Sequence, residues 1–200
     1  MKRGFAALLQ IADTFRNRLD YGRALDALDL SNDAEEQYAI AAAIAEVQRD
    51  PASFYAAETA RLAVVLYEQP PEGYTKALRI SERLIATGWA DIDRRVYAYR
   101  AAALGQWYRD PNAGTTEAQR KQIRDDALQM VKQAVVNPSV RETVEFLWNK
   151  DKPTKQTDTK LARENDLEAF FDDPDFRKAI KGDQPAAGPA PQPAPAAPAA

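Results

Sequence analysis

The sequence predicts an all-α protein. Apolar residues recur at intervals of three and four through residues 3–149, whereas the strict alternation of a β-strand is scarce. Gly and Pro fall mainly between these periodic segments, where chain breaks belong. The spacing predicts helices over 3–19, 21–30, 33–49, 52–68, 73–87, 91–109, 116–136 and 139–149, followed by two short helices within 158–181.

Several of these segments have residues suited to a helix end. Asn32 or Asp33 can accept hydrogen bonds from free backbone amides, Pro51 suits a first turn, and Asp91 precedes an apolar helical pattern. Gly88, Asp110-Pro111 and Asn137-Pro138 follow three other segments and predict their ends.

The composition excludes many chemistries. The 200 residues include no His and no Cys, which removes Ser-His-Asp and Cys-His catalysis and the best zinc ligands. The acidic pairs are adjacent in sequence, so on a helix they point about 100° apart and form no acid/base dyad. We therefore expect no enzyme activity, no metal and no cofactor.

Charge and hydropathy limit the partners. A net charge of -3 disfavours nucleic acid and anionic membranes as partners. The N-terminal run MKRGFAALLQIADTF keeps helical spacing and lacks a cleavage site, so we interpret it as an amphipathic helix and not as a secretory signal. No apolar run reaches the roughly 20 residues that cross a bilayer. We expect a cytoplasmic protein.

The C-terminal composition changes abruptly at residue 182. Residues 182–200 are rich in Pro and Ala and contain no large apolar side chain, so they are expected to form a disordered tail or linker. The predicted organisation is a helical array over 1–150, a capping segment over 151–181 and the tail over 182–200.

A weak internal repeat runs through the helical array. The segments YGRAL at Tyr21 and YTKAL at Tyr74 share a Y-x-[RK]-A-L pattern. The strongest helix pair has motif residues on both helices, and Pro138 follows the second helix. The motif residues are Leu104, Gly105 and Tyr108 on the first helix and Ala127, Val131 and Ala134 on the second. The sequence here resembles the tetratricopeptide-repeat family, in which L-G-x-x-Y marks the first helix of each pair and the second begins near Y-x-x-A-L.

Weaker copies of this pattern occur upstream. One starts at Ala12 and Phe15 and continues with Ala24, and another starts at Ala63 and continues with Ala77. The copies recur at about fifty residues, whereas the family repeats at about thirty-four. The resemblance implies antiparallel helix pairs stacked as a right-handed superhelix, with the 33–49 helix as an irregular addition. The alternative is an irregular helical bundle in which these short patterns occur by chance.

The resemblance also implies a function and a set of binding residues. Proteins of this family display a groove formed by the first helix of each pair, which binds a peptide or protein, so we expect a non-enzymatic adaptor. The implied groove positions are Tyr99, Ala102, Gln106, Arg109, Asp13, Arg16, Glu58 and Arg61. Solvated side chains without a binding role are the alternative for each. A regulatory or sensor domain of a longer, enzymatic protein is the alternative for the whole chain.

An arginine-rich stretch over residues 94–124 raises a separate possibility. It contains seven basic residues and two acidic ones, interleaved with Tyr97, Tyr99, Trp107 and Tyr108. One interpretation is a dock for an acidic peptide or, less favoured, RNA that stacks on the aromatic rings. The other is that the rings belong to the core and the arginines pair with neighbouring aspartates.

The acidic stretch ENDLEAFFDDPDFRKAI at residues 164–180 suggests either a metal site or a structural end to the array. Its apolar residues are spaced to cover an exposed terminal face, namely Leu167, Phe170, Phe171, Phe176 and Ile180. Asp166 and the Asp173-Pro174-Asp175 break suit helix starts. The pattern D-L-x-x-F-x-x-D-P-x-F also resembles a segment that follows the last repeat in bacterial tetratricopeptide proteins, which favours a cap.

Overall fold

A computed structural model describes residues 12–148 and 165–182. The start of the first expected helix and the Pro/Ala-rich tail lie outside these residues. Every regular element within the two ranges is helical, as the sequence predicts. None of the helices there combines the length and the apolar character that a membrane span requires.

The described elements follow one another with short connections. In chain order they are α2 Phe15–Asp26, α3 Ser31–Val47, α4 Pro51–Val65, α5 Glu72–Ala86, α6 Trp89–Ile92, α7 Arg95–Arg109, α8 Glu117–Ala134, α9 Pro138–Trp148, the 3-10 helix η2 Glu168–Phe170 and α10 Pro174–Lys181.

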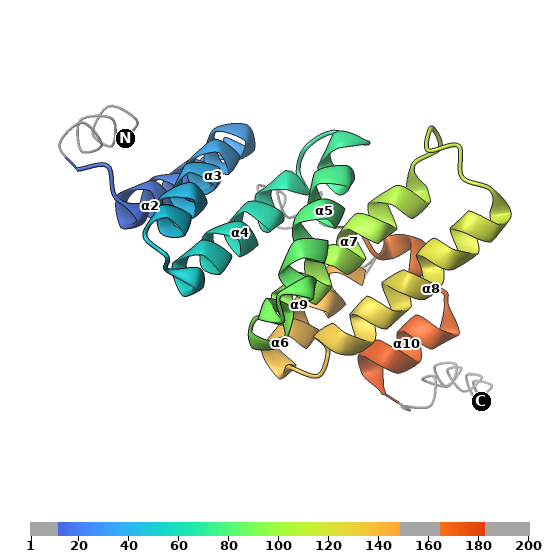
Figure 1. The fold of residues 1–200 in the computed structure, drawn as a ribbon. Coiled ribbons are helices and arrows are strands. Elements are labelled where there is room, and N and C mark those ends of the chain that lie inside the picture. The colour runs from blue at the N-terminus through green and yellow to red at the C-terminus, as the bar shows by residue number, and fades with distance from the viewer. Residues whose placement is uncertain (1–11, 149–164, 183–200) are drawn as a thin grey trace, which may run out of the picture.

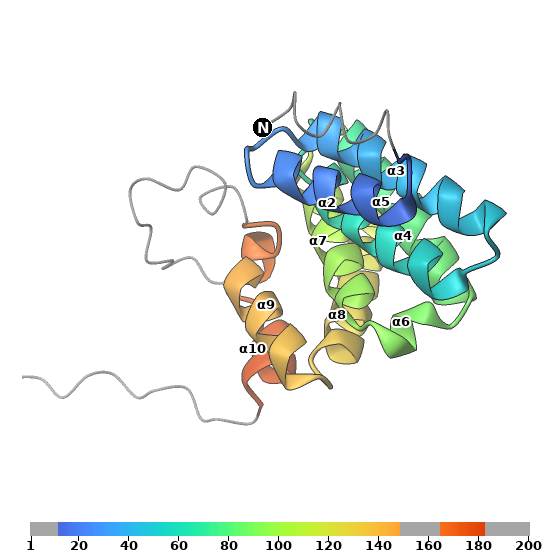
Figure 2. The same cartoon turned by 90° about the vertical axis from the view of Figure 1, so that its left-hand side faces the viewer.

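The helices pack mainly against their neighbours in sequence. Helix α2 contacts α3, α3 contacts α4, α4 contacts α5, α5 contacts α7, and α7 contacts α8 (Figure 1). Some helices that are not consecutive also touch. Helix α4 lies against both α2 and α7, and α9 lies against α7. Helices α9 and α10 and the η2 turn gather beside α7 and α8 (Figure 2). The result is a layered stack of helices.

Side-chain caps begin five of the described helices. Each cap accepts a hydrogen bond from a free amide of the following first turn, and the five are Thr14, Asp50, Thr116, Asn137 and Asp173. At Thr116 the bond is reciprocal, since the Gln119 side chain accepts from the Thr116 amide at 2.8 Å. Of the residues expected at helix starts, Pro51 and Asp173 take these positions. Asn32 and Asp33 do not cap α3, because this helix already begins at Ser31 and has no side-chain cap.

Two predicted helix boundaries are wrong. No break occurs at residue 20, because α2 runs from Phe15 to Asp26. The repeat copy that starts at Ala12 and Phe15 therefore does not form a helix pair, since Phe15 and Ala24 lie on the same helix. Asp91 lies within the short α6, and α7 starts only at Arg95 after a turn in which the Asp93 carboxylate accepts from the Arg95 amide at 3.2 Å.

Gly22 lies where α2 approaches α3. A Cβ atom at this position would lie 2.6 Å from the ring of Tyr38 on α3, so glycine permits the close approach of α2 and α3. Helix α3, expected to be an irregular addition, is thus the packing partner of both α2 and α4. The pairs α4/α5 and α7/α8 do pack as the sequence predicts.

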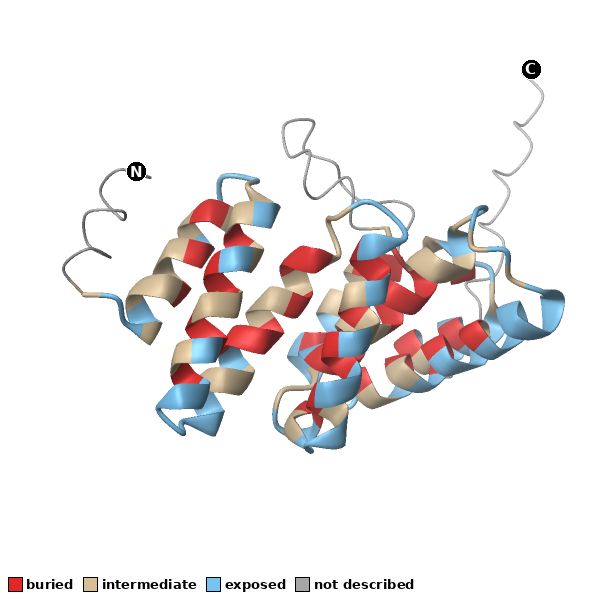
Figure 3. Cartoon of the chain, turned by 45° about the horizontal axis from the view of Figure 1, so that its top comes forward, coloured by how far each residue is buried: buried red, intermediate tan, exposed pale blue. Residues whose placement is uncertain are grey.

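The buried residues form two clusters that share α4 (Figure 3). The first joins α2, α3 and α4 and includes Leu25, Tyr38 and Val64. The second is larger and extends from α4 to α10, with Leu62 and Val65 at its edge. Because α4 contributes to both clusters, it forms the wall between them.

The C-terminal segment completes the second cluster. Leu167, Phe170, Phe176 and Ile180 are buried, and Phe171 is half-buried against Trp148. The rings of Phe170 and Phe176 stack with centroids 4.4 Å apart, and Phe170 packs against Tyr108 of α7 at 4.9 Å.

Polar contacts fix the same segment in place. The Trp148 indole N–H donates to the Phe170 carbonyl at 3.0 Å. Arg124 of α8 donates two hydrogen bonds to the Asp173 carboxylate, at 2.7 and 2.8 Å. Although burial would raise it, the bonds from Arg124 and from the Asp175 amide hold the pKa of Asp173 below its usual value. The acidic residues around Pro174 therefore serve helix capping and ion pairing.

A candidate binding cleft beside helix α7

A cleft opens where the connection between α4 and α5 meets the end of α7. It measures about 650 Å³ and is lined by Leu66, Tyr67, Glu68, Gln69, Pro70, Pro71, Gln106, Arg109, Asp110, Pro111, Asn112 and Asp166. A smaller pocket of about 130 Å³ shares Leu66, Tyr67 and Asp166 with it and adds Tyr99. We call the two together the α7 cleft. Its volume lies in the range of small-molecule and peptide side-chain sites.

Helical spacing places two α7 residues and the residue that follows the helix on the cleft. Tyr99 and Gln106 are seven residues apart on one face of α7, and Asp110, the C-cap, follows Gln106 by four. Ala102, expected on the same surface, is instead fully buried in the core. The α7 cleft thus combines Tyr99, Gln106 and Arg109, three of the eight expected groove positions.

The Gln106 side chain is fixed by two acceptors. Its Nε2 donates to the Leu66 carbonyl at 2.8 Å and to Asp166 Oδ1 at 3.0 Å. Since both partners are acceptors, the orientation of the amide is unambiguous. This arrangement leaves Gln106 Oε1 buried without a hydrogen-bond partner. A buried acceptor that lacks a donor costs free energy.

Asp166 connects the C-terminal segment to α7. The residue is only 6% exposed, and its carboxylate also lies 3.5 Å from Arg109 Nη2. Its backbone explains Gly105, because a Cβ atom there would lie 2.1 Å from the Asp166 carbonyl oxygen. The small residue of the L-G-x-x-Y motif therefore admits the C-terminal segment, whereas the sequence predicts a contact between paired helices. Sequence reasoning placed Asp166 near a helix start and missed its role in the cleft.

Asp110 supplies a second carboxylate. Its Oδ2 accepts from the Tyr74 hydroxyl at 3.0 Å and its Oδ1 accepts from the Asn112 amide at 2.8 Å. Burial, together with this hydrogen bond, raises the pKa of Tyr74, which stays protonated as a donor at neutral pH. The third carboxylate of the lining, Glu68, forms an ion pair with Lys76 at 2.9 Å.

The other proposed binding residues lie elsewhere. Arg61 bonds to Glu35 at 2.7 Å and lies 3.5 Å from Glu58, and Glu58 also pairs with Arg83. Glu58 is only 2% exposed, so it belongs to an ionic network between α3, α4 and α5 and not to a surface groove.

Arg16 and Asp13 lie at the far end of the stack. Arg16 pairs loosely with Asp20 at 3.8 Å, and Asp13 is occupied by Arg18 at 2.7 Å. The structure therefore does not bring Arg61, Arg16 and Asp13 to the α7 cleft.

The arginine-rich stretch is largely used by the fold. Arg94, Arg95 and Arg124 lie within ion-pair distance of Asp91, Asp93 and Asp125, and Arg100 donates to the Leu78 carbonyl. Of the aromatic residues, Tyr97 is buried and the rest are half-buried against the second core, with Arg120 over the Tyr108 ring. These contacts favour the interpretation in which the stretch is structural.

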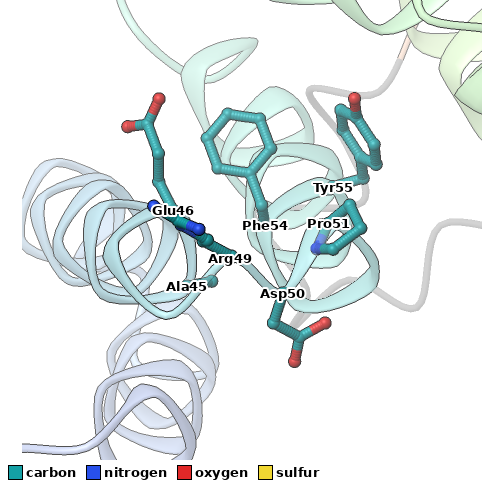
Figure 4. A pocket seen from close by; sticks show the side chains of 7 residues that line it. All are labelled: Ala45, Glu46, Arg49, Asp50, Pro51, Phe54 and Tyr55. Carbon is teal, nitrogen blue, oxygen red and sulfur yellow. The ribbon is translucent and has the colours of Figure 1, made fainter.

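A second pocket lies at the turn between α3 and α4. It measures about 260 Å³ and is lined by Ala45, Glu46, Arg49, Asp50, Pro51, Phe54 and Tyr55. The carboxyl groups of Glu46 and Asp50 point away from each other (Figure 4), and Asp50 is already the cap of α4. This pocket has no converging polar groups, so the α7 cleft is the stronger candidate.

Within the two described ranges, no group of three or more metal-binding side chains occurs. Comparison with protein-family models, with curated proteins and with solved structures finds no match for this chain.

Proposed function

We propose that the protein is a non-enzymatic interaction module that binds a segment of a partner protein in the α7 cleft. The stacked helix pairs then form a scaffold of the tetratricopeptide type, bacterial and cytoplasmic, with residues 165–182 as its cap. The observation that carries the proposal is the α7 cleft of about 650 Å³, in which Gln106 and Arg109 line one side. Concave sites of this size with a few polar groups in their lining are where ligands usually bind.

The shape of the cleft also supports a peptide ligand. One side is the connection between α4 and α5, whose chain includes the consecutive Pro70 and Pro71, and the other is the last turn of α7. A rigid lining loses little conformational freedom when a ligand binds. Tyr99 in the adjoining pocket adds an aromatic contact surface for a second ligand residue.

Blocking the cleft covalently tests the proposal. The chain has no cysteine, so Asn112→Cys introduces a single thiol at an exposed position of the lining, and Arg16→Cys places one far away. Each variant is used to select binders from a random-peptide display library, before and after coupling to a maleimide–polyethylene glycol. We expect selected peptides to bind both free thiol variants and to lose binding only when residue 112 is coupled. No enriched peptide, or binding that survives coupling at residue 112, would overturn the proposal.

A further inference from the structure

A small pocket lies between α4 and α5, apart from the α7 cleft. It measures about 190 Å³ and is lined by Arg61 of α4 and by Arg79, Ile80 and Arg83 of α5. We call it the α4/α5 pocket, and it shares no described residue with the α7 cleft. Its volume is below the about 300 Å³ at which sites for drug-sized ligands begin, so it suits a single small group. Because three arginines line it, the group that it attracts is an anion.

Two of the arginines are held by carboxylates that lie outside the lining. Arg61 donates to Glu35 at 2.7 and 2.9 Å. Glu58, which is only 2% exposed, pairs with both Arg61 and Arg83. The Arg83 guanidinium also lies over the Phe54 ring, 5.3 Å from its centroid. These contacts fix the two guanidinium groups before a ligand arrives, which lowers the conformational cost of binding.

Arg83 keeps donors for a ligand. Its bond to Glu58 uses Nη2, and its Nε and Nη1 atoms donate to no described residue. The side chain is 51% exposed, so the fold does not enclose the guanidinium. Since a guanidinium has five N–H donors, Arg83 can hold Glu58 and a ligand at the same time.

Arg79 has no partner in the fold. Its side chain is exposed, and within the two described ranges it forms no hydrogen bond and no ion pair. It precedes Arg83 by four residues on α5, so the two side chains are neighbours on one helix face. An anion between them would accept hydrogen bonds from both at once.

The surrounding charges do not neutralise Arg79. Lys76, three residues earlier on α5, is held by Glu68 at 2.9 Å. Glu72 and Glu82 belong to the same helix, but neither lies within ion-pair distance of Arg79. Each of the other cations in this ionic network has a carboxylate partner, so Arg79 remains as the unpaired positive charge.

We infer that the α4/α5 pocket binds an oxyanion, a carboxylate or phosphate group, which accepts hydrogen bonds from Arg79 and Arg83, with Arg61 as the third positive charge of the lining. This site goes beyond the proposed function, because it is distinct from the α7 cleft. A guanidinium presents its N–H donors in a rigid planar fork that matches the oxygens of either group. A cationic ligand would meet three like charges in the lining.

The test titrates the full chain with inorganic phosphate and with three blocked peptides, Ac-Gly-X-Gly-amide, in which X is glutamate, phosphoserine or glutamine. Binding is followed by NMR through the backbone amides of Arg79, Ile80 and Arg83, at constant ionic strength. We expect the glutamate and phosphoserine peptides to shift these resonances. The glutamine peptide keeps the size of the glutamate peptide and loses its charge, so it should bind about tenfold more weakly, as charged hydrogen bonds are the stronger ones.

Matched variants connect the effect to Arg79. Arg79→Gln should weaken oxyanion binding about tenfold, and it removes no contact of the fold, because Arg79 has no partner there. Arg79→Lys keeps the charge and loses the planar fork, so its affinity should lie between the two. Arg16→Gln is the control, since it removes the same charge from a side chain that is 88% exposed and lies at the far end of the stack. It should leave affinity within about twofold. Circular dichroism and thermal unfolding check that the variants fold.

The outcomes separate the sources of the oxyanion and the two sites. Inorganic phosphate that binds as tightly as the phosphoserine peptide would support the pocket with free phosphate as its ligand, and weaker binding of inorganic phosphate would support a side-chain group. Equal binding by wild type and Arg79→Gln, or equal binding of the charged peptides and the glutamine peptide, would overturn the inference. Coupling polyethylene glycol to Asn112→Cys should leave oxyanion binding unchanged. A loss on coupling would place the anion in the α7 cleft and also overturn the inference, whereas a failure of library peptides to bind that cleft would not affect it.

Discussion

The two cores of this protein are built from different side chains. The first, between α2, α3 and α4, relies on small residues such as Ala41 and Ala42 and on the contact of Gly22 with Tyr38. The second also contains alanines, among them Ala101 and Ala102, but it adds large stacked rings, with Phe170 and Phe176 at its C-terminal end. Small residues let helix backbones approach closely, whereas large ones fill the space between helices that lie farther apart. The second core should therefore be the more sensitive to lost volume, whereas added volume should be costly in either core where elements approach closely, as at Gly22 and Gly105.

The largest expected effect comes from removing volume in the second core. Phe176→Ala should lower the free energy of unfolding by about 3–5 kcal/mol, because the ring is fully buried and stacked on Phe170. Urea unfolding followed by circular dichroism measures the loss. Phe15→Ala removes the same atoms from a half-buried ring in the first core and should cost less. Equal losses would remove the contrast between the two cores.

The pH dependence should also differ between the cores. Burial, with a smaller effect of Asp26, raises the pKa of Tyr38 to about 12, compared with about 10 in an unfolded chain. A raised pKa contributes stability that is present below pH 10 and lost as the pH rises through the folded value. Tyr38 should therefore cost about 1.4 kcal/mol of stability per pH unit between the unfolded value of about 10 and the folded value of about 12. In urea titrations, Tyr38→Phe should make the free energy of unfolding less dependent on pH over this range. An unchanged slope of this free energy against pH would contradict the prediction. Tyr74 and Tyr97 in the second core contribute in the same direction.

In acid the second core should weaken first. The pKa of Asp173 lies below its ordinary value, so its contribution is present above the unfolded value of about 3.9 and is lost as the pH falls through the folded value. Hydrogen exchange of the α10 amides below about pH 4 should therefore increase before that of the α2 and α3 amides. Asp173→Asn should remove much of this acid dependence.

Two glycine substitutions compare the close approaches directly. Gly105→Ala should destabilise the fold by about 2 kcal/mol, since the new methyl group would meet the backbone of Asp166. Gly22→Ala meets the side chain of Tyr38, which can adjust in part, and alanine gains up to about 1 kcal/mol in helix propensity. We expect the second change to cost less in thermal unfolding. A larger loss of stability in Gly22→Ala would show that the ring of Tyr38 cannot move aside.

The smallest expected effect is a gain in stability. In the described residues, the positive φ angles near the first core belong to Asp29 and Arg49, at 58° and 56°, whereas the second core has Gly88 and Gly114 in such conformations. A left-handed conformation costs a non-glycine residue about 1–2 kcal/mol, partly offset by the entropy that glycine loses on folding. Arg49→Gly should therefore raise the free energy of unfolding by about 0.5 kcal/mol. Asp29→Gly should gain less, because aspartate tolerates this conformation better.

Sequence reasoning succeeded where the signal is local. Helices α4, α5, α7 and α8 follow from apolar spacing, and the cap at Asp173 follows from the Asp-Pro pair. It failed at residue 20, where the expected break is absent because α2 continues to Asp26. It also missed the contact of Gly22 with Tyr38, sixteen residues away, which no local pattern reveals.

The site was predictable in part for the same reason. Tyr99, Gln106 and Arg109 follow from the spacing along one helix, and they do line one cleft. The contact of Gln106 with Asp166 joins residues sixty positions apart, so it arises only when the chain folds. Arg61 lies away from this cleft, where it forms ion pairs with Glu35 and Glu58. The binding roles of all these residues remain predictions.

The shared wall between the cores limits how the chain can change length. Val64 and Val65 are consecutive on α4, yet Val64 belongs to the first core and Val65 to the second. Inserting or deleting one residue earlier in α4 would turn everything beyond it by about 100° and misdirect both side chains. The exposed connection at residues 110–116 has no such constraint and should accept added residues. Insertions and deletions among relatives should therefore fall in such connections, with the length of α4 kept constant.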